Sequence, residues 1–176
     1  LSMESKVDLQ TLKTGRLERR DWDDLNVALD TLSNSNIHID DTAGISIMEM
    51  KSKCRRLKAE AGLDLVIIDY LQLMNPEGKA DSRTQEISVI SRNLKLLARE
   101  LDCPVLVLSQ LSRAPEQRTD HRPMLSDLRE SGSIEQDADI VIFLYRDEYY
   151  NKEDTEKPGE CEVILAKHRS ARLGQR

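Results

Sequence analysis

Cysteine is scarce in this sequence, and its spacing excludes two kinds of site. The three cysteines, Cys54, Cys103 and Cys161, are odd in number, far apart, and never form a Cys-x-x-Cys pair. A disulfide framework needs an even, closely spaced set, and a zinc site needs paired cysteine or histidine ligands. The composition therefore favours a cytoplasmic protein without structural disulfides or zinc.

Long apolar runs are also missing. The longest have the length of a β-strand, and no basic region followed by an apolar stretch opens the chain, so we predict neither a membrane span nor a signal peptide. The 176 residues carry a formal net charge of −6, which gives no general argument for nucleic-acid binding. Any DNA contact must therefore be local. The length predicts a single domain over residues 1–176.

A glycine-rich phosphate loop is absent as well. Such a loop follows the pattern Gly-x-x-x-x-Gly-Lys-Ser/Thr, because its backbone N–H groups must approach an anion without an intervening Cβ. None of the seven glycines fits this pattern. Gly78-Lys79 comes nearest, but Ala80 follows it and Leu73 occupies the earlier glycine position.

One carboxylate stands out where a buried strand should end. The apolar run over residues 64–74 contains Asp69 in the sequence Val-Ile-Ile-Asp-Tyr. In P-loop nucleotide hydrolases, an aspartate at the carboxyl end of a parallel strand holds the Mg²⁺ that neutralises the phosphates. An ordinary strand-end or helix-capping aspartate is the alternative interpretation.

The remaining pattern predicts an α/β fold. Apolar residues at helical spacing predict helices, and short apolar runs predict strands that are buried on both faces in a parallel sheet covered by helices. An alternating segment after a charged loop predicts an edge β-hairpin. The predicted helices cover residues 21–32, 47–57 and 87–101, and the predicted strands cover residues 37–39, 64–69, 104–108, 140–145 and 160–167.

Four long strings identify a family. They are Asp-Tyr-Leu-Gln-Leu-Met at 69–74, Leu-Ser-Gln-Leu-Ser-Arg at 108–113, the segment from Arg-Pro-Met-Leu to Gln-Asp-Ala-Asp at 122–139, and Leu-Tyr-Arg-Asp-Glu-Tyr-Tyr at 144–150. Together they closely resemble the C-terminal RecA-like motor domain of bacterial replicative DNA helicases of the DnaB type. The resemblance implies ATP and Mg²⁺ as cofactors, a homo-hexameric ring on single-stranded DNA, and primase and a helicase loader as partners.

The chain departs from the family pattern at both ends. The family carries its phosphate loop, and the glutamate that activates water, before the region that matches here; Glu4 in Leu-Ser-Met-Glu-Ser is a poor candidate for that glutamate. After Arg169, the family's Asn-Gly-Pro turn is replaced by Ser-Ala-Arg. We therefore expect one RecA-like motor domain that is incomplete before residue 1 and after residue 169, and inactive by itself.

The resemblance assigns roles to three further residues. Gln110, after the strand at 104–108, is expected to sense the nucleotide phosphate, although an ordinary loop glutamine is the alternative. Lys167 and Arg169 lie two apart on a strand, so both point to one face. Charges on an edge strand often only prevent aggregation, but the family inserts this Lys-x-Arg pair into the neighbouring subunit's nucleotide site, where an arginine stabilises developing phosphate charge.

The predicted DNA-binding residues lie between 110 and 137. This stretch mixes Arg113, Arg118, Arg122 and Arg129 with almost as many acidic residues, so its composition alone indicates a solvated loop. In the family it lines the central channel, and the resemblance assigns DNA contact to Arg113, Arg129, Glu130 and Gly132. The stretch contains no aromatic residue for base stacking, which favours contacts to the DNA backbone.

Two other functions stay open at this point. One is a recombinase-like or phage primase-helicase ATPase that shares the RecA core. The other is a non-catalytic interaction module that docks onto complete subunits of such a ring, because the phosphate loop is missing.

Overall fold

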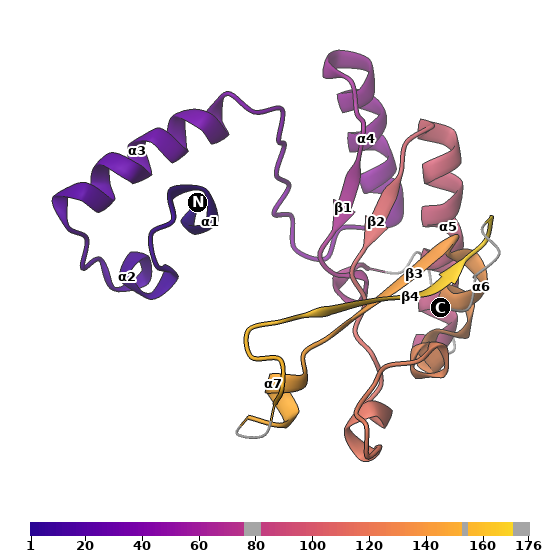
Figure 1. Cartoon of the computed structure of the whole chain (residues 1–176). Helices are drawn as coiled ribbons and strands as arrows, with labels where there is room; N and C mark the ends of the chain where they lie inside the picture. Colours follow the sequence, from indigo (N-terminus) through magenta and orange to yellow (C-terminus); the bar gives the residue numbers. More distant parts are fainter. Residues whose placement is uncertain (76–81, 153–154, 171–176) are drawn as a thin grey trace. The chain divides into compact units, whose positions relative to one another are not determined.

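The computed structural model describes residues 1–75, 82–152 and 155–170, with the side chains of 129–132 left out of the description. The chain forms two compact units, Leu1–Asp41 and Thr42–Arg176 (Figure 1). The sequence predicted one continuous domain over both, and that remains a prediction.

The first unit is helical. Asp8 begins one of its helices, because its carboxylate accepts hydrogen bonds from the backbone N–H groups of Gln10 and Thr11 at 2.8 and 3.0 Å. Leu25 and Ala28 are buried on the long helix that the sequence predicted at 21–32. The three helices are α1 (Ser2–Ser5), α2 (Leu9–Thr14) and α3 (Arg19–Ser33).

The strand predicted at residues 37–39 is wrong. This segment has no regular secondary structure, and Ile37 and Ile39 are 63% and 89% exposed. No strand among the described residues pairs with it. A single apolar run cannot form a strand without a hydrogen-bonding neighbour, which the alternation of residue types does not reveal.

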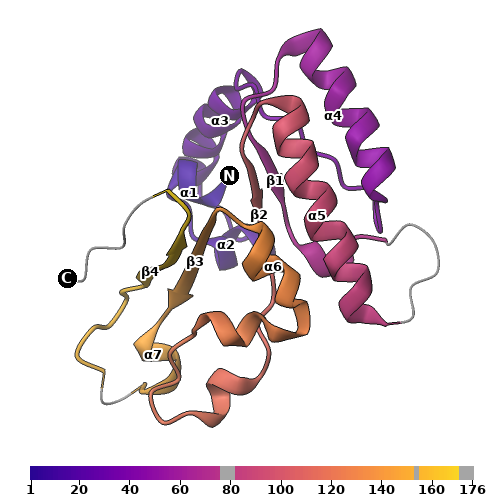
Figure 2. The same ribbon diagram turned by 90° about the vertical axis from the view of Figure 1, so that its right-hand side faces the viewer.

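The second unit contains a parallel strand pair covered by two helices. Helices α4 (Ile47–Ala61) and α5 (Arg83–Leu101) pack against β1 (Val66–Ile68) and β2 (Val105–Val107), as Figure 2 shows. Each helix begins after a serine, Ser46 or Ser82, whose hydroxyl accepts a backbone hydrogen bond from the first turn. All five predicted stripe positions of α5 are buried: Ile87, Ile90, Leu94, Leu97 and Leu101.

The parallel pairing of β1 with β2 confirms the predicted βαβ arrangement. Val66 pairs with Val105 and Ile68 with Val107. The described helices of this unit pack against one face of the strand pair. Helical cover of the other face, which the sequence also predicted, is not found among the described residues, because Ile67 is 59% and Leu106 52% exposed.

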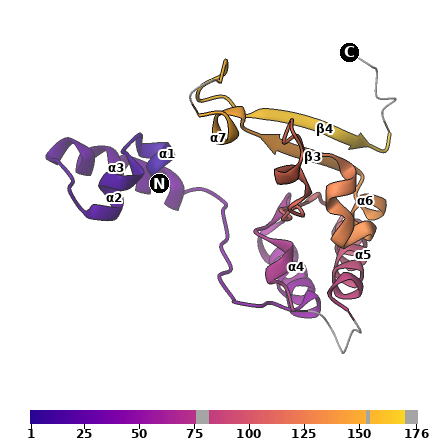
Figure 3. The same cartoon turned by 90° about the horizontal axis from the view of Figure 1, so that it is seen from below.

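The third predicted core strand belongs to a different sheet. Strand β3 (Ile140–Tyr145) pairs antiparallel with β4 (Glu162–His168), and Figure 3 shows the two running side by side. The edge hairpin is therefore confirmed, whereas parallel pairing of residues 140–145 with β1 or β2 is not found among the described residues. Alternate residues of β3 are exposed, so an all-apolar strand is here buried on one face.

Short elements connect β2 to the hairpin, and one helix extends its turn. None of the helices in the described ranges is long and apolar enough to cross a membrane. The short elements are η1 (Leu71–Leu73) after β1, then η2 (Ala114–Gln117), η3 (Leu125–Ser131), α6 (Gly132–Asp137) and, after β3, α7 (Asp147–Tyr150).

Candidate nucleotide site and DNA-facing loop

The carboxyl ends of β1 and β2 lie side by side. Asp69 follows β1 directly, and Gln110 follows β2 after two residues. Backbone hydrogen bonds of 2.9 Å continue the pairing past both strands, from Leu108 N–H to Ile68 O and from Leu71 N–H to Leu108 O. The structure thus brings together two segments whose ends were predicted to meet a phosphate ligand.

Gln72 fastens these two ends together. Its side-chain oxygen accepts the Gln110 backbone N–H at 3.3 Å, and its amide nitrogen donates to Ser109 Oγ at 3.1 Å. Arg83 donates to the Gln72 backbone oxygen at 2.6 Å. Sequence analysis missed this residue, although an amide three positions after Asp69 was the signal that a strand-end polar contact was present.

The Asp69 side chain is available for a ligand. It is exposed, and no hydrogen bond or ion pair joins its carboxylate to another described residue. No group of three or more metal-ligating side chains exists among the described residues. One carboxylate with amide and hydroxyl oxygens nearby still suits Mg²⁺, which keeps several water ligands and binds through one or two carboxylates plus substrate phosphates.

Lys167 and Arg169 share one side of the hairpin, as predicted from their spacing. Both side chains reach the Gln136 carbonyl at the C-terminus of α6, each at 3.5 Å, and Lys167 also donates to the Glu135 carbonyl. Arg169 forms an ion pair with Asp139 at 3.3 Å. No contact among the described residues joins either cation to Asp69 or Gln110, so the structure does not bring these two pairs together.

Asp139 lies between two cations. Lys95 of α5 forms an ion pair with its carboxylate. The hydrogen bond from Lys95, together with the charge of Arg169, lowers the pKa of the Asp139 carboxyl below its ordinary value. This carboxylate therefore stays ionised and holds Arg169 near the end of α6.

The predicted DNA-contacting residues lie along one connecting stretch. Arg113 is exposed, and its side chain makes no hydrogen bond or ion pair with other described residues. Arg129 and Glu130 belong to η3, and Gly132 begins α6, while their side chains lie outside the described part. Their roles in DNA binding remain predictions.

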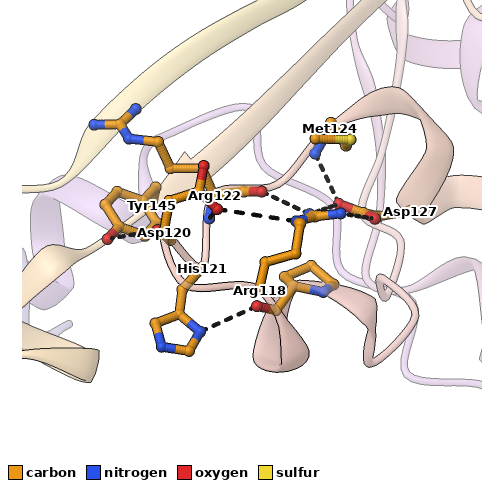
Figure 4. A network of polar contacts seen from close by, with 8 residues as sticks. Arg118, Asp120, His121, Arg122, Met124, Asp127 and Tyr145 are labelled. Carbon is orange, nitrogen blue, oxygen red and sulfur yellow. Dashed lines mark hydrogen bonds and ion pairs between the residues drawn. The ribbon is translucent and has the colours of Figure 1, made fainter.

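Two other arginines of this stretch are used internally (Figure 4). Arg118 donates from both terminal nitrogens to the buried Asp127 carboxylate and also to the Arg122 backbone oxygen. Arg122 forms a two-point ion pair with Glu162 of β4, at 2.7 and 2.8 Å, and lies 4.8 Å above the Tyr145 ring. Neither is free for a nucleic-acid phosphate in this conformation.

These pairs change the acidity of their carboxyl groups. Hydrogen bonds from Arg118 lower the pKa of the Asp127 carboxyl, and those from Arg122 lower the pKa of Glu162. Burial raises the pKa of the Tyr145 hydroxyl, which donates to the Asp120 backbone oxygen at 3.3 Å. Sequence analysis predicted a loop of solvated charges here, and the observed pairs contradict that for Arg118 and Arg122.

Glu4, the weakest predicted catalytic residue, is exposed in α1 of the first unit. Asp69 and Gln110 both belong to the second unit. The assignment of Glu4 as a catalytic base gains no support.

Comparisons with known proteins agree on one family. The family model of the DnaB-like helicase C terminal domain matches residues 1–176. The replicative DNA helicase DnaC of Bacillus subtilis (strain 168) is 57% identical over 175 residues, which are 99% of this chain and 38% of that protein. The chain thus spans well under half the length of this relative.

Solved structures show the same fold. One solved helicase ATPase domain superposes with a TM-score of 0.90 at 53% identity, over 95% of this chain and 60% of that one. A DnaB-like replicative helicase, solved to show its interactions with primase, has a TM-score of 0.89 at 53% identity and covers 95% of this chain and 41% of its own. These matches confirm the predicted RecA-like α/β fold, and the chain belongs to the DnaB-like helicase C-terminal domain family.

Proposed function

We propose that this chain is the nucleotide-hydrolysing motor segment of a replicative helicase. In this proposal, ATP hydrolysis drives a homo-hexameric ring along single-stranded DNA in the cytoplasm and unwinds the duplex. The observation that carries it is the adjacency of the β1 and β2 carboxyl ends, which present Asp69 and Gln110 at one edge of a parallel strand pair. In α/β proteins this edge is where ligands bind.

Each residue would have a distinct task. Asp69 would hold Mg²⁺, directly or through water, and the bound ion would neutralise charge on the ATP phosphates. Gln110 would hydrogen-bond the terminal phosphate or the attacking water, with its backbone fixed by Gln72. Lys167 and Arg169 would act on the site of the neighbouring subunit, consistent with their lack of described contacts to Asp69 or Gln110 within one chain.

The proposed partners follow from the family. The related DnaB-like helicase was solved with its interactions with primase, and we extend primase binding, a helicase loader and single-stranded DNA to this protein. The rival ATPase classes, recombinases and phage primase-helicases, lack comparable support because the reported relatives are replicative helicases of the DnaB type.

The decisive experiment replaces Asp69. We define the full-length form as a helicase of the curated relatives' length that contains these 176 residues. In this form, Asp69→Asn should lower the rate of ATP hydrolysis roughly a hundredfold or more, because an amide is a weaker Mg²⁺ ligand than a carboxylate. Steady-state phosphate release measures the effect.

A matched control comes from the opposite end of the same strand. Asp64 is also exposed and precedes β1, where no phosphate site is proposed. Asp64→Asn should leave the hydrolysis rate within about twofold, as expected for a surface substitution. Equal rates for Asp69→Asn and the unsubstituted protein would remove Asp69 from the site.

A further inference from the structure

Asp127 is a buried carboxylate at the start of the DNA-facing segment. The residue is 2% exposed, which is rare for an aspartate unless it is paired. Its carboxylate accepts hydrogen bonds from both terminal nitrogens of Arg118 and from the Met124 backbone N–H at 2.8 Å (Figure 4). Charge-assisted, two-point pairs of this kind fix geometry more tightly than neutral hydrogen bonds.

The backbone of the same residue is tied to the strand-end site. Asp127 O accepts the backbone N–H of Ser112 at 3.0 Å. Ser112 follows Gln110 by two residues, and Gln110 is itself held by Gln72. Residues Gln110, Ser112 and Asp127 also line one small cavity.

Arg118 closes the loop between these two points. It lies midway along the segment from Ser112 to Asp127 and binds Asp127 and the Arg122 backbone oxygen at once. A displacement at Gln110 therefore acts on η3 through Asp127, because the pair leaves the loop little freedom to absorb it. The next residues along the chain are the buried Leu128 and then Arg129, the predicted DNA contact.

We propose that Arg118 and Asp127 are positioning residues that make the sensor loop and η3 move together, so that the nucleotide state at Gln110 sets the position of the DNA-contacting segment. The inference rests on the proposed helicase function. Neither residue touches ATP or DNA in it. Both act through Gln110 on one side and Arg129 on the other.

A neighbouring ion pair offers a control. Arg122 and Glu162 form an equally direct two-point pair from the same loop, but Glu162 belongs to β4 and the pair does not reach η3. A general loss of loop stability should follow from breaking either pair. Loss of coupling should follow only from breaking the Arg118–Asp127 pair.

The experiment compares three variants in the full-length form. Arg118→Lys keeps the charge but loses the planar, two-point donor geometry. The double variant Arg118→Met with Asp127→Asn removes both charges, so no buried charge is left unpaired, and the Asn oxygen still accepts the Met124 N–H. Glu162→Gln breaks the control pair.

Four quantities are measured: ATP hydrolysis without DNA, its stimulation by single-stranded DNA, unwinding, and the thermal unfolding midpoint. Arg118→Lys and the double variant should keep DNA-independent hydrolysis within about twofold, while DNA stimulation and unwinding fall about tenfold or more. Glu162→Gln should retain stimulation and unwinding.

Three results would overturn the proposal. One is normal DNA stimulation and unwinding by both coupling variants. Another is a parallel loss of DNA-independent hydrolysis, unwinding and the unfolding midpoint, which would make the pair merely structural. The last is equal uncoupling by Glu162→Gln. If the unsubstituted protein neither hydrolyses ATP nor unwinds DNA, the proposed function itself fails, which is a separate result.

Discussion

Two adjacent leucines on α5 give a direct test of the fold beneath the site. Leu97 is 0% exposed and Leu96 is 50% exposed. Leu97 belongs to the core cluster that also includes Ile68, the residue directly before Asp69. Replacing each leucine by alanine makes the same chemical change on the same helix, so helix propensity cancels in the comparison.

The expected magnitudes differ several-fold. Leu97→Ala removes buried methyl and methylene groups and leaves a cavity, which costs about 2–5 kcal/mol of unfolding free energy. Leu96→Ala removes a half-exposed side chain and should cost about 1 kcal/mol or less. With a urea dependence of roughly 2 kcal/mol per molar, Leu97→Ala should lower the urea midpoint by about 1–2 M.

Urea denaturation of the 176-residue chain followed by circular dichroism measures both values. The slope of free energy against urea should be unchanged, because neither substitution alters the surface exposed on unfolding by much. Equal midpoints for the two variants would refute the assignment of Leu97 to the core. A larger loss for Leu96→Ala would place the helix with its opposite face inward.

Three further predictions concern the site. Arg129→Ala should weaken single-stranded DNA binding about equally for all sequences and reduce the slope of log affinity against log salt by about 0.7; an unchanged slope in a variant with a lower melting temperature would indicate a structural role. Arg169→Ala and Asp69→Asn should each be inactive, yet mixed rings should recover hydrolysis at about a quarter of their interfaces, where both groups are intact. Mixed rings no more active than either parent, with mixing verified, would contradict this. Asp127→Asn should be less stable than wild type at neutral pH, and the difference should narrow in urea titrations as pH falls below 3.8, because Arg118 holds the folded carboxyl below that ordinary pKa and its stabilisation is lost on protonation. A difference that does not change with pH would contradict the ionised pair.

The sequence was sufficient where one side chain pattern had one structural solution. Five apolar positions at spacings of three and four residues determined the buried face of α5, and all five are buried. Asp69 was placed after a strand because the apolar run before it had no helical spacing, and β1 does end at Ile68. In both cases the determining interactions are local or involve a single continuous face.

The sequence failed where pairing partners decided the structure. Residues 37–39 and 140–145 are both apolar and strand-like, yet the first has no partner in the described chain and the second pairs antiparallel with β4. Strand propensity does not contain information about which edge a strand will meet. The clamp by Gln72 and the Arg118–Asp127 pair were likewise missed, since residue type does not show that an arginine in a charged loop faces a buried acid.

The same distinction separates the two cations of the hairpin. Lys167 is partly buried and donates to two carbonyls at the end of α6, whereas Arg169 is exposed and holds Asp139 in a surface ion pair. Surface ion pairs contribute roughly 0–1 kcal/mol, so a phosphate can displace the carboxylate from Arg169 at little cost. Releasing Lys167 would leave its partly buried ammonium without those carbonyls. The contacts within one chain therefore favour Arg169 as the group that leaves its own subunit's surface to meet the neighbour's nucleotide, with Lys167 anchoring the strand that carries it.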